Sequence, residues 1–435
     1  MGNIVCKFGG TSVADDTQIR KVEKIIRSDS RRRFIIPSAP GKRFENDTKI
    51  TDLLYSCHDK ANSGGDILEP FNIIRQRYTD ISTSLCPKLN IAQLLDELKH
   101  RIENGASRDY IASRGEYLCG KVIAALMDAK FIDPADGILF SDNGQLDRQS
   151  YERLSELLEG DGLFVVPGFY GATRDGEIKT FTRGGSDVTG AIVARAVNAD
   201  IYENWTDVPG VLMADPKIIC NPKPVKEITY RELRELSYMG AKVLHEEAVF
   251  PARELNIPIK VLNTNEPDDS GTIIRHERDY SNTPVAGIAG RDKFSLINIE
   301  KALMNWEVGF GRRVLEIIES YGISYEHSPT GIDSMSVIIR DEELSAAGEA
   351  IKEEIRRKLA PDRIEISSGL ALIAIVGHGI SQHPSITARI FNALAEENIK
   401  IDVICLGGSA INLIVGVREK DFKKAIKAIY DSLVE

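Results

Sequence analysis

The segment Lys7-Phe8-Gly9-Gly10-Thr11-Ser12 joins an apolar run at Ile4–Phe8 to a helical pattern that begins near Thr17. Adjacent glycines let backbone N–H groups approach phosphate oxygens, because neither residue carries a Cβ. A lysine that ends a strand can reach the terminal phosphates of a nucleotide, where charge builds up during transfer, and we expect Lys7 to face solvent there. The segment matches neither a Walker A motif nor a full G-x-G-x-x-G, and an isolated Gly-Gly pair more often marks a simple tight turn.

The order of apolar run, loop and amphipathic helix continues to about Ala289. This alternation predicts βαβ units and therefore an α/β fold, with a mostly parallel sheet sandwiched by helices. Ligands bind such sheets at the carboxyl ends of the strands. The predicted strands are Ile4–Phe8, Phe34–Pro37, Gly137–Phe140, Leu163–Pro167, Ile201–Trp205 and Pro258–Leu262, and the predicted helices include Thr17–Arg27, Leu89–Asn104, Ile111–Ala129, Tyr151–Glu159, Ser186–Asn198 and Tyr230–Met239.

The pattern changes after Arg275, where the polar segment His276–Pro284 predicts a linker. Two successive βαββα-like units follow, which predicts a duplicated ferredoxin-like α+β module; one irregular α+β domain is the alternative. We expect a catalytic domain at residues 1–284 and regulatory modules at residues 285–362 and 363–435. The first module would contain Phe294–Ala302, Phe310–Tyr321, Met335–Arg340 and Glu342–Lys358, and the second Leu370–Val376, Thr387–Asn398, Ile401–Cys405, Ile411–Val415 and Asp421–Leu433.

The composition excludes several classes of protein. The 435 residues carry a net charge of -10, which argues against a nucleic-acid binder because phosphate neutralisation needs a basic face. The six cysteines include no C-x-x-C pair and the seven histidines lack metal-ligand spacing, so we expect reduced thiols and no protein-held metal centre. No segment has the pattern of a transmembrane helix or a signal peptide, so we expect a cytoplasmic protein that does not bind a membrane.

A second glycine loop, Thr182-Arg183-Gly184-Gly185-Ser186-Asp187, also precedes a predicted helix. Arg183 would bind a substrate carboxylate through two parallel hydrogen bonds, and Asp187 would orient Lys7 or bind Mg²⁺ together with phosphates. The alternative is structural: Ser186 and Asp187 would cap the helix, and Arg183 would lie on the surface. Two strand–loop–helix glycine sites in one sheet domain favour the functional interpretation.

Three further segments have both a functional and a structural interpretation. Trp205-Thr206-Asp207-Val208-Pro209-Gly210 is a nucleotide shelf or a turn with a capping Asp. Lys242 is a phosphate contact or a snorkelling surface lysine. Glu116 is an ordinary exposed helix residue or a binding group for a substrate amine, because the neighbouring Gly115 lets something approach the helix closely.

In this order, these fragments resemble the aspartokinases within the amino-acid-kinase superfamily. The resemblance covers nearly the whole chain, and after these motifs come two modules that resemble ACT domains. It implies transfer of the γ-phosphoryl group of MgATP to the β-carboxylate of L-aspartate, giving 4-phospho-L-aspartate, the first step toward lysine, threonine and methionine. A carboxylate nucleophile is already ionised at neutral pH, so the enzyme needs no general base and must instead screen the repulsion between two anions. The motifs are Lys7–Val13, Arg114-Gly115-Glu116, Arg183–Asp187, Thr206–Gly210 and Gly240–His245.

The resemblance also implies roles for individual residues. Lys7 and Asp187 would be catalytic, with Lys7 stabilising the transferring phosphoryl group and Asp187 organising the centre. Arg183 would hold the α-carboxylate of aspartate, and Glu116 its amino group. The other substrate residues would be Ser38, Thr51, Phe169, Gly184 and Ser186, and ATP would contact Lys7, Gly9, Gly10, Thr11, Ser12, Thr206, Asp207, Leu212, Lys217 and Lys242.

Four positions or segments depart from many relatives. Leu212 stands where many relatives carry Tyr and Lys217 where they carry Arg, which leaves the shape of the nucleotide shelf open. Glu246 replaces the usual Pro after the histidine. The segment Pro40–Thr48 is longer and more charged than in many relatives, and it is either a mobile flap over the active site or a surface insertion.

The ACT-like modules predict regulation by an amino acid. Such modules commonly pair across subunits and bind an end product at a helix start, and Gly309 forms a turn at a helix N-terminus that can seat a carboxylate. We expect inhibition by lysine, threonine or both in a homodimer or tetramer; the alternative is that the modules only dimerise. The effector pocket would be formed by Met304, Gly309, Phe310, Tyr325, Glu326 and Thr330.

Two other functions are alternatives. One is a different kinase of the superfamily, acting on glutamate, N-acetylglutamate or a nucleotide, which the order of motifs and the paired ACT-like tail disfavour. The other is an amino-acid-sensing protein whose kinase site has decayed, which the joint presence of the predicted catalytic and substrate-binding residues disfavours.

Overall fold

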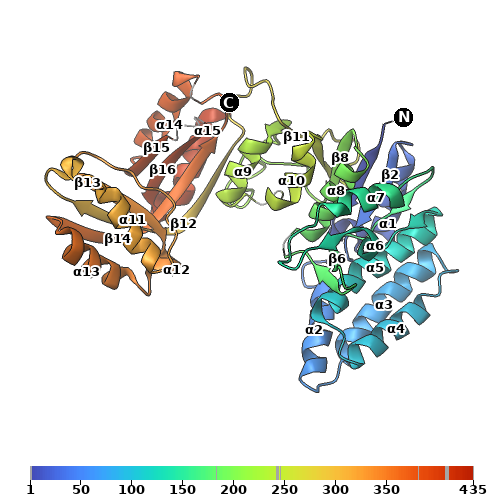
Figure 1. Ribbon diagram of the computed structural model, residues 1–435. Coiled ribbons are helices and arrows are strands. Elements are labelled where there is room, and N and C mark those ends of the chain that lie inside the picture. Colours follow the sequence, from blue (N-terminus) through green and yellow to red (C-terminus); the bar gives the residue numbers. More distant parts are fainter. Residues whose placement is uncertain are drawn as a thin grey trace. The chain divides into compact units, whose positions relative to one another are not determined.

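The computed structural model describes residues 2–182, 184–241, 244, 246–380, 382–406 and 411–434, with residues 246 and 247 described by their backbone alone. The chain divides into two compact units, whose elements are labelled in Figure 1. The chain leaves unit 1 for unit 2 and returns twice before its final crossing after Arg278. Unit 1 comprises Met1–Val211, Pro224–Leu233 and Lys242–Arg278, and unit 2 comprises Leu212–Lys223, Arg234–Ala241 and Asp279–Glu435.

Unit 1 is built on an eight-stranded sheet in the order β3-β5-β2-β1-β8-β10-β11-β9. Every strand pair is parallel except β10 with β11, which confirms the predicted α/β class. A smaller three-stranded sheet, β4-β6-β7, was not predicted as a separate element. The strands of unit 1 are β1 Ile4–Phe8, β2 Arg32–Pro37, β3 Lys130–Phe131, β4 Leu139–Phe140, β5 Phe164–Val165, β6 Tyr170–Thr173, β7 Ile178–Thr180, β8 Ile201–Thr206, β9 Glu227–Thr229, β10 Ile259–Asn263 and β11 Thr272–Arg275.

The central strand β1 is buried on both faces. Ile4, Cys6 and Phe8 point into the core that the helices α1 to α5 form on one face of the sheet. Because side chains alternate along a strand, Val5 and Lys7 point to the opposite face, where α8 packs against β1. All five residues of β1 are buried, as expected for a parallel strand covered by helices on both sides.

The predicted helices of unit 1 are observed, and the structure adds α2, α3, α6 and α10. The residues that precede the two long helices α2 and α3, Lys49 and Ile67, make no side-chain cap, although Oδ1 of Asp66 accepts the N–H of Leu68 at the start of α3. The predicted strand at Gly137–Phe140 is wrong in its first half, because Gly137 closes the short helix α6. The helical elements are η1 Gly10–Val13, α1 Asp16–Arg27, α2 Ile50–Asn62, α3 Leu68–Leu85, α4 Ile91–Glu103, α5 Arg108–Met127, α6 Pro134–Gly137, α7 Gln149–Leu157, α8 Gly185–Ala196, α9 Tyr230–Tyr238 and α10 Glu246–Glu254.

Unit 2 is built on a five-stranded antiparallel sheet in the order β13-β12-β14-β16-β15. Its two long strands, β12 and β14, have 14 residues each and pair with one another from end to end. The elements are β12 Gly287–Glu300, η2 Met304–Trp306, α11 Phe310–Ser320, β13 Ser334–Arg340, α12 Asp341–Leu344, α13 Gly348–Leu359, β14 Arg363–Val376, α14 Pro384–Glu396, β15 Ile401–Leu406, β16 Asn412–Arg418, η3 Glu419–Asp421 and α15 Phe422–Leu433.

The two predicted α+β units are the two halves of this one sheet. Helices α11 and α13 cover one half and α14 and α15 the other, each with its own core. The predicted starts of the long strands at Phe294 and Leu370 are wrong, because both strands begin earlier and continue through both halves. The polar residues Arg291, Asp292 and Lys293 conceal this continuity: the strand register shifts there, and Lys293 adopts a left-handed φ of 66°.

The two halves of the sheet differ at one position, which strand β15 occupies in the second half. The corresponding segment of the first half forms only isolated bridges, from His327 to Ile338 and from Thr330 to Met335. In the second half, residues Ala214 and Ile219 join the core with α14 and α15, although they precede the sheet by many residues in the chain. The second half therefore includes part of the segment Leu212–Lys223.

The polar segment His276–Pro284 is more than a linker. Arg278 is buried in unit 1 and forms a two-pronged ion pair with Glu232, at 2.8 Å from Nε to Oε2 and 2.7 Å from Nη2 to Oε1. The carboxylate of Glu232 also accepts hydrogen bonds from the N–H and hydroxyl of Thr229. The predicted linker segment therefore contains, near its start, a residue that anchors the chain in unit 1 before it enters unit 2.

Among the described residues, no helix combines the length and apolar character needed to cross a bilayer.

Candidate active site

The Lys7 ammonium lies inside unit 1. Lys7 is 8% exposed, since β1 runs between β2 and β8 and α8 covers its face of the sheet. Its Nζ forms an ion pair with Oδ1 of Asp187 on α8 and lies 3.3 Å from Oδ1 of Asn204. The expectation that Lys7 faces solvent is therefore wrong, while the predicted pairing of Lys7 with Asp187 is observed.

Asn204 on β8 completes this centre and was missed in the sequence. It stands opposite Lys7 in the neighbouring parallel strand, so both side chains point to the same face. Its Nδ2 donates to Oδ1 of Asp187 at 2.9 Å. An amide within a buried central strand was the available signal, because such a strand is otherwise apolar. The three side chains form one buried polar cluster at the centre of the sheet.

The first glycine turn is held between two other segments. The N–H of Gly9 donates to the carbonyl of Trp205 on β8 at 2.9 Å. A side chain on Gly10 would place its Cβ 3.0 Å from the carbonyl oxygen of Ala39, so the close packing of these two segments favours glycine there. The turn continues as η1, which contains Thr11 and Ser12. The structure therefore shows the tight turn that the glycine pair indicated, and this turn directly follows the end of β1.

Ser12 has a structural partner. Its hydroxyl lies 2.8 Å from Oγ1 of Thr264 in the interior, and its N–H donates to the carbonyl of Gly9. Both polar groups of Ser12 are occupied within the protein, so the prediction that Ser12 contacts ATP gains no support from this geometry.

The second glycine loop starts α8 without a side-chain cap. The N-cap is Gly184, with a left-handed φ of 56°, and Ser186 and Asp187 lie within the first helical turn. The structural alternative, in which these two side chains cap the helix, is therefore wrong. A carboxylate in the first turn is stabilised by the partial positive charge of the helix N-terminus. Arg183, the predicted carboxylate-binding residue, lies outside the described residues.

Phe169 packs directly on this loop. A Cβ on Gly185 would lie 2.5 Å from Cδ2 of Phe169, and a Cβ on Gly168 would lie 2.5 Å from the Cβ of Ser186. Phe169 adopts a φ of 82°, a conformation that is costly for an aromatic residue and is common at ligand sites. Its N–H donates to Oγ1 of Thr189 at 3.1 Å, which helps to hold it there. Tertiary structure thus brings the predicted residues Phe169 and Ser186 together.

The predicted substrate residues Ser38 and Thr51 flank the loop that follows β2. The N–H of Ser38 donates to the carbonyl of Phe8 at 3.0 Å, which places Ser38 beside the end of β1. Thr51 lies in the first turn of α2, whose first residue, Ile50, donates its N–H to the carbonyl of Pro40 at 3.2 Å. Both residues therefore belong to one connected group of loops at the carboxyl end of the sheet.

Glu116 is buried in α5 and only partly satisfied. It is 5% exposed, and burial raises the pKa of its carboxyl to about 8, against smaller opposing effects of hydrogen bonds from the backbone of Ala39 and of Glu116 itself. Its Oε2 is buried without a hydrogen-bond partner in the described part of the chain. An unpaired buried carboxylate oxygen is costly, and a ligand cation would satisfy it. The alternative of an ordinary exposed helix residue is wrong.

The two residues before Glu116 have packing roles. Gly115 faces Ala39, because an added Cβ would lie 2.7 Å from the Cβ of Ala39. The close approach that the sequence suggested for a substrate is thus made by the loop after β2. The guanidinium of Arg114 lies over the rings of Tyr110, Tyr117 and Tyr170, at 4.6, 4.4 and 5.2 Å from their centroids.

The predicted nucleotide residues fall into three groups. Thr206 ends β8 in unit 1 and donates its hydroxyl to the carboxylate of the exposed Asp207 at 3.2 Å. Leu212 and Lys217 belong to the segment Leu212–Lys223 of unit 2. Lys242 lies outside the described residues.

The predicted effector residues are of two kinds. The side chains of Met304 and Phe310 are buried in the core of the first half of unit 2, so they do not line an open pocket. Glu326 accepts hydrogen bonds from Arg340 and Tyr238. The backbone turn at Gly309, with φ 78°, and the side chains of Tyr325 and Thr330 are exposed.

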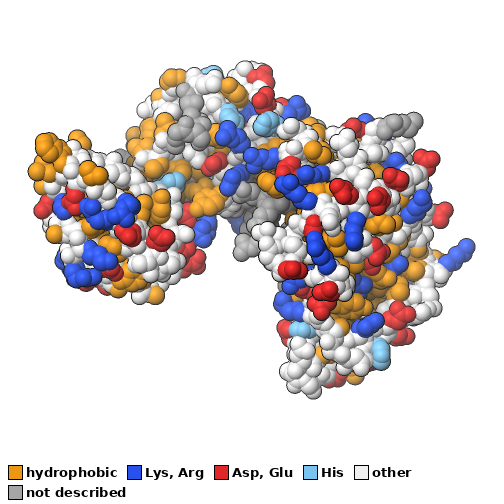
Figure 2. Space-filling view, viewed as in Figure 1, with side chains coloured by type: hydrophobic (Ala, Val, Ile, Leu, Met, Phe, Trp, Pro, Cys, Tyr) orange, Lys and Arg blue, Asp and Glu red, His pale blue; other side chains and the backbone are white. Residues whose placement is uncertain are grey.

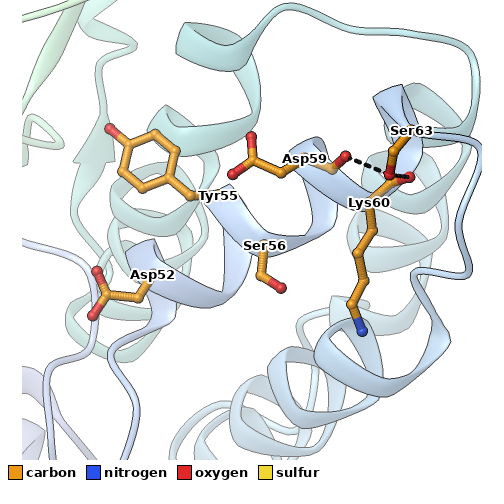
Figure 3. A pocket seen from close by; sticks show the side chains of 6 residues that line it. All are labelled: Asp52, Tyr55, Ser56, Asp59, Lys60 and Ser63. Carbon is orange, nitrogen blue, oxygen red and sulfur yellow. Dashed lines mark hydrogen bonds between the residues drawn. The ribbon is translucent and has the colours of Figure 1, made fainter.

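A hollow of about 480 Å³ lies along the outer face of α2 (Figure 3). Five of its side chains come from this helix, where residues three and four positions apart share a face, and the sixth comes from Ser63, the residue that follows the helix. It contains none of the predicted catalytic or substrate residues, and it is a groove between neighbouring side chains. Its lining residues are Asp52, Tyr55, Ser56, Asp59, Lys60 and Ser63.

No group of three or more His, Cys, Asp or Glu side chains that could hold a metal ion occurs in the described residues. This does not conflict with a magnesium ion delivered with a nucleotide, because Mg²⁺ usually takes one or two protein carboxylates together with phosphate oxygens and water. Both contacts of Asp187 use Oδ1, so Oδ2 is available for such a role within the part of the chain described.

Comparison with known proteins identifies the two parts of the chain. A model of the amino acid kinase family matches residues 3–263, and a model of the ACT domain matches residues 373–433. Aspartokinase 3 of Bacillus subtilis is 40% identical over 98% of this chain and 97% of its own length. The crystal structure of Clostridium acetobutylicum aspartate kinase, described as an allosteric enzyme, superposes with a TM-score of 0.90 at 50% identity and full coverage of both chains. Aspartokinase III of E. coli in complex with aspartate and ADP gives a TM-score of 0.75 at 27% identity, again over both whole chains.

Proposed function

This chain belongs to the amino acid kinase family and, within it, to the aspartokinases, and we propose that it transfers the γ-phosphoryl group of ATP to L-aspartate at the centre formed by Lys7 and Asp187. The oxygen of the aspartate β-carboxylate attacks the γ-phosphorus, the bond to the β–γ bridging oxygen breaks, and ADP leaves. No proton has to be removed from the nucleophile, which agrees with a centre that contains a lysine and no histidine.

The observation that carries the proposed site is the buried, partnerless Oε2 of Glu116. The ammonium group of aspartate is a cation of the right size to satisfy it, and a charge-assisted hydrogen bond between the two would orient the substrate. Ser38 lies on the loop after β2 and Thr51 in the first turn of α2; the loop after β2 also contains Ala39, whose backbone reaches Glu116. Glu116, Ser38 and Thr51 would bind the part of aspartate that carries its α-amino group. Phe169 and Ser186 would lie on the side of α8.

Lys7 supplies the positive charge at the reacting phosphoryl group. In the free enzyme its charge is balanced by Asp187, which Asn204 holds in place. When a polyphosphate arrives, Lys7 can bind phosphate oxygens without leaving the buried cluster, so little reorganisation is needed. The partly exposed backbone at Gly10 and Thr11, where η1 begins, can add N–H dipoles that favour negative charge.

Magnesium would be held by Asp187 together with the phosphates of ATP, and it would neutralise phosphate charge during transfer. Thr206 and Asp207 are the proposed contacts for the nucleoside part, because they lie at the carboxyl end of β8, next to β1. Lys242 is a further proposed ATP contact in unit 1, and the contacts expected at Leu212 and Lys217, which belong to unit 2, stay a prediction. The enzyme would act in the cytoplasm, where ATP and reduced cysteines coexist.

Unit 2 would bind an amino-acid effector and pair two subunits. E. coli aspartokinase III has been crystallised with lysine and aspartate in a T-state. In this chain, large apolar side chains stay exposed around the start of α11: Val308 is 92% and Trp306 79% exposed, and Leu303, Tyr325 and Ile332 are also exposed. In Figure 2, hydrophobic side chains gather at the end of unit 2 that carries the label β13 in Figure 1. Such a patch fits a subunit contact.

A direct assay tests the proposed reaction. ADP release should depend on aspartate and MgATP, with far less turnover of glutamate or N-acetylglutamate. Lack of turnover with aspartate would contradict the substrate assignment. For the regulatory part, activity is measured with millimolar lysine and threonine, singly and together; equal activity under all conditions would reduce unit 2 to a dimerisation domain.

A further inference from the structure

The loop between β2 and α2 is closed by one buried guanidinium. Residues 42–46 are exposed, while Gly41 before them and Asp47 after them are buried. Arg77 of α3, itself 2% exposed, donates from Nη1 to the carbonyl of Gly41 at 3.1 Å. Its Nη2 donates to both oxygens of Asp47, at 2.9 and 2.8 Å. One side chain therefore binds both ends of the loop and fixes the distance between them.

The closed end of this loop lies against the first glycine turn. The N–H of Gly41 donates to the carbonyl of Gly10 at 2.8 Å. The two backbones are so close that a Cβ on Gly41 would lie 2.7 Å from the carbonyl carbon of Gly10. The carbonyl of Pro40, one residue earlier, accepts the N–H of Ile50 at the start of α2. The loop therefore touches both the turn that follows Lys7 and the helix end that carries Thr51.

A stabilising role alone does not account for this ion pair. Buried ion pairs often contribute little net stability, because the loss of hydration offsets the attraction, and apolar residues of the same volume serve as well. Arg77 also carries a cost, since its Nε is buried without a partner in the described chain. What a planar guanidinium provides and an apolar side chain does not is a fixed geometry toward a carboxylate and a carbonyl at once.

We propose that Arg77 and Asp47 are positioning residues for phosphoryl transfer: they hold Gly41 against Gly10, and so set the position of the glycine turn beside Lys7. Neither residue touches a substrate in this proposal. Arg43 reinforces the clamp from the exposed side, with its Nε 2.8 Å from Oδ2 of Asp47. The segment Pro40–Thr48 is thus a braced loop that supports the site. The proposal rests on the function proposed above, because it assumes that the glycine turn binds phosphate.

The experiment compares four variants with the wild-type enzyme: Arg77→Met, Asp47→Asn, Gly41→Ala and the control Arg75→Met. Arg75 lies on the same helix but pairs with Asp96 at the surface, so its loss removes an arginine and an ion pair without touching the loop. Each protein is assayed for kcat, for KM of ATP and of aspartate, for ADP affinity by fluorescence or calorimetry, and for its unfolding temperature.

We expect Arg77→Met and Asp47→Asn to lower kcat/KM for ATP by on the order of 10²-fold, since misplacement of a binding loop by about 1 Å has that effect. Gly41→Ala should act in the same direction while the ion pair stays intact, because the new methyl group pushes the loop away from Gly10. Arg75→Met should stay within about twofold. Weaker ADP binding should accompany the loss in each loop variant that remains folded at the assay temperature.

Two results would overturn the proposal. One is a lower unfolding temperature in Arg77→Met or Asp47→Asn with unchanged kinetic constants per folded enzyme, which would mean that the pair only stabilises the fold. The other is an unchanged Gly41→Ala enzyme, a test that remains valid if the ion-pair variants do not fold. An inactive wild-type enzyme would contradict the proposed function instead, so the two failures are distinguishable.

Discussion

Two turns in this chain place a glycine before a helix and were both expected to receive a negatively charged group, yet the two turns differ in burial. The turn at Gly9 and Gly10 is enclosed: it is bonded to β8, packed on the loop after β2, and adjacent to the buried Lys7. The turn at Gly309 is open, and the preceding residue, Val308, is 92% exposed. The same local signal thus occurs in two environments that favour different functions.

The difference indicates which kind of ligand or partner each turn is suited to bind. In the first turn the charges are already held by protein partners, which is what stabilisation of a developing charge requires. At the second turn, Arg313 and Arg312 lie 3.8 and 4.0 Å from where a Cβ on Gly309 would stand, and Arg313 pairs with Glu307. These charged groups stand beside the exposed apolar side chains of Trp306 and Val308. Covering apolar surface is favourable, so this region is suited to a partner surface, with the effector as an additional ligand. The predictions below test this contrast.

The largest expected effect comes from removing the charge at the enclosed turn. Lys7→Met should lower kcat by about 10³-fold, because a preorganised donor to the transferring group is lost. The measurement is steady-state turnover with saturating aspartate and ATP. Lys24→Met, an exposed lysine on α1, is the control and should be unchanged. Turnover within tenfold of wild type in Lys7→Met would contradict the assigned centre.

Neutralising Glu116 should affect one substrate only. In Glu116→Gln the ammonium of aspartate loses a charged partner, which should lower kcat/KM for aspartate by about 10- to 100-fold. The KM for ATP should change little. Glu97→Gln on the surface of α4 serves as the control. Equal losses for both substrates would show that Glu116 supports the fold of the site and does not bind aspartate.

The raised pKa of Glu116 predicts a pH dependence with a defined sign. Its folded pKa of about 8 lies above the ordinary 4.5, so folding retains a proton that the unfolded chain releases. The stability from this group is fully present below about pH 4.5 and is lost as the pH rises through 8. Aspartate requires the ionised form, so its KM should fall as the pH rises toward 8, by up to about tenfold per pH unit.

Glu116→Gln should remove this pH dependence of KM. The variant should also gain in unfolding temperature relative to wild type at pH 8.5 more than at pH 6, because wild type must then bury a charge. A wild-type KM that is flat between pH 6 and 8 would mean that Glu116 is ionised before aspartate binds.

The smallest expected effect is at the open turn. Trp306→Glu should shift subunits toward the monomer, raising the dimer dissociation constant by about tenfold or more, since a charge in an apolar contact is poorly tolerated. Analytical ultracentrifugation measures the shift, and activity without effector should persist. Ile73→Glu, which alters an exposed apolar residue on α3, is the control. An unchanged association state would place the subunit contact elsewhere.

Much of the catalytic unit could be predicted from the sequence. The strands β1 and β8, the helix α8 that begins at Gly185, and the pairing of Lys7 with Asp187 all follow from local periodicity and glycine positions. The helices α2 and α3 were missed, since their N-cap residues Lys49 and Ile67 are not of the usual capping types, although Asp66 accepts the N–H of Leu68. The long strand β12 was shortened in the prediction because a polar bulge interrupts its apolar pattern.

The sequence by itself determined the family, the reaction class and the segments that carry the chemistry, because periodicity, glycine turns and motif order are local properties of the chain. Only the tertiary structure decided that Lys7 is buried, that Glu116 holds a raised pKa and a free oxygen, and that Arg77 clamps the loop beside Gly10. The reason is physical: burial and charge pairing depend on which distant segments meet, and each of these three side chains is surrounded by residues far from it in the chain.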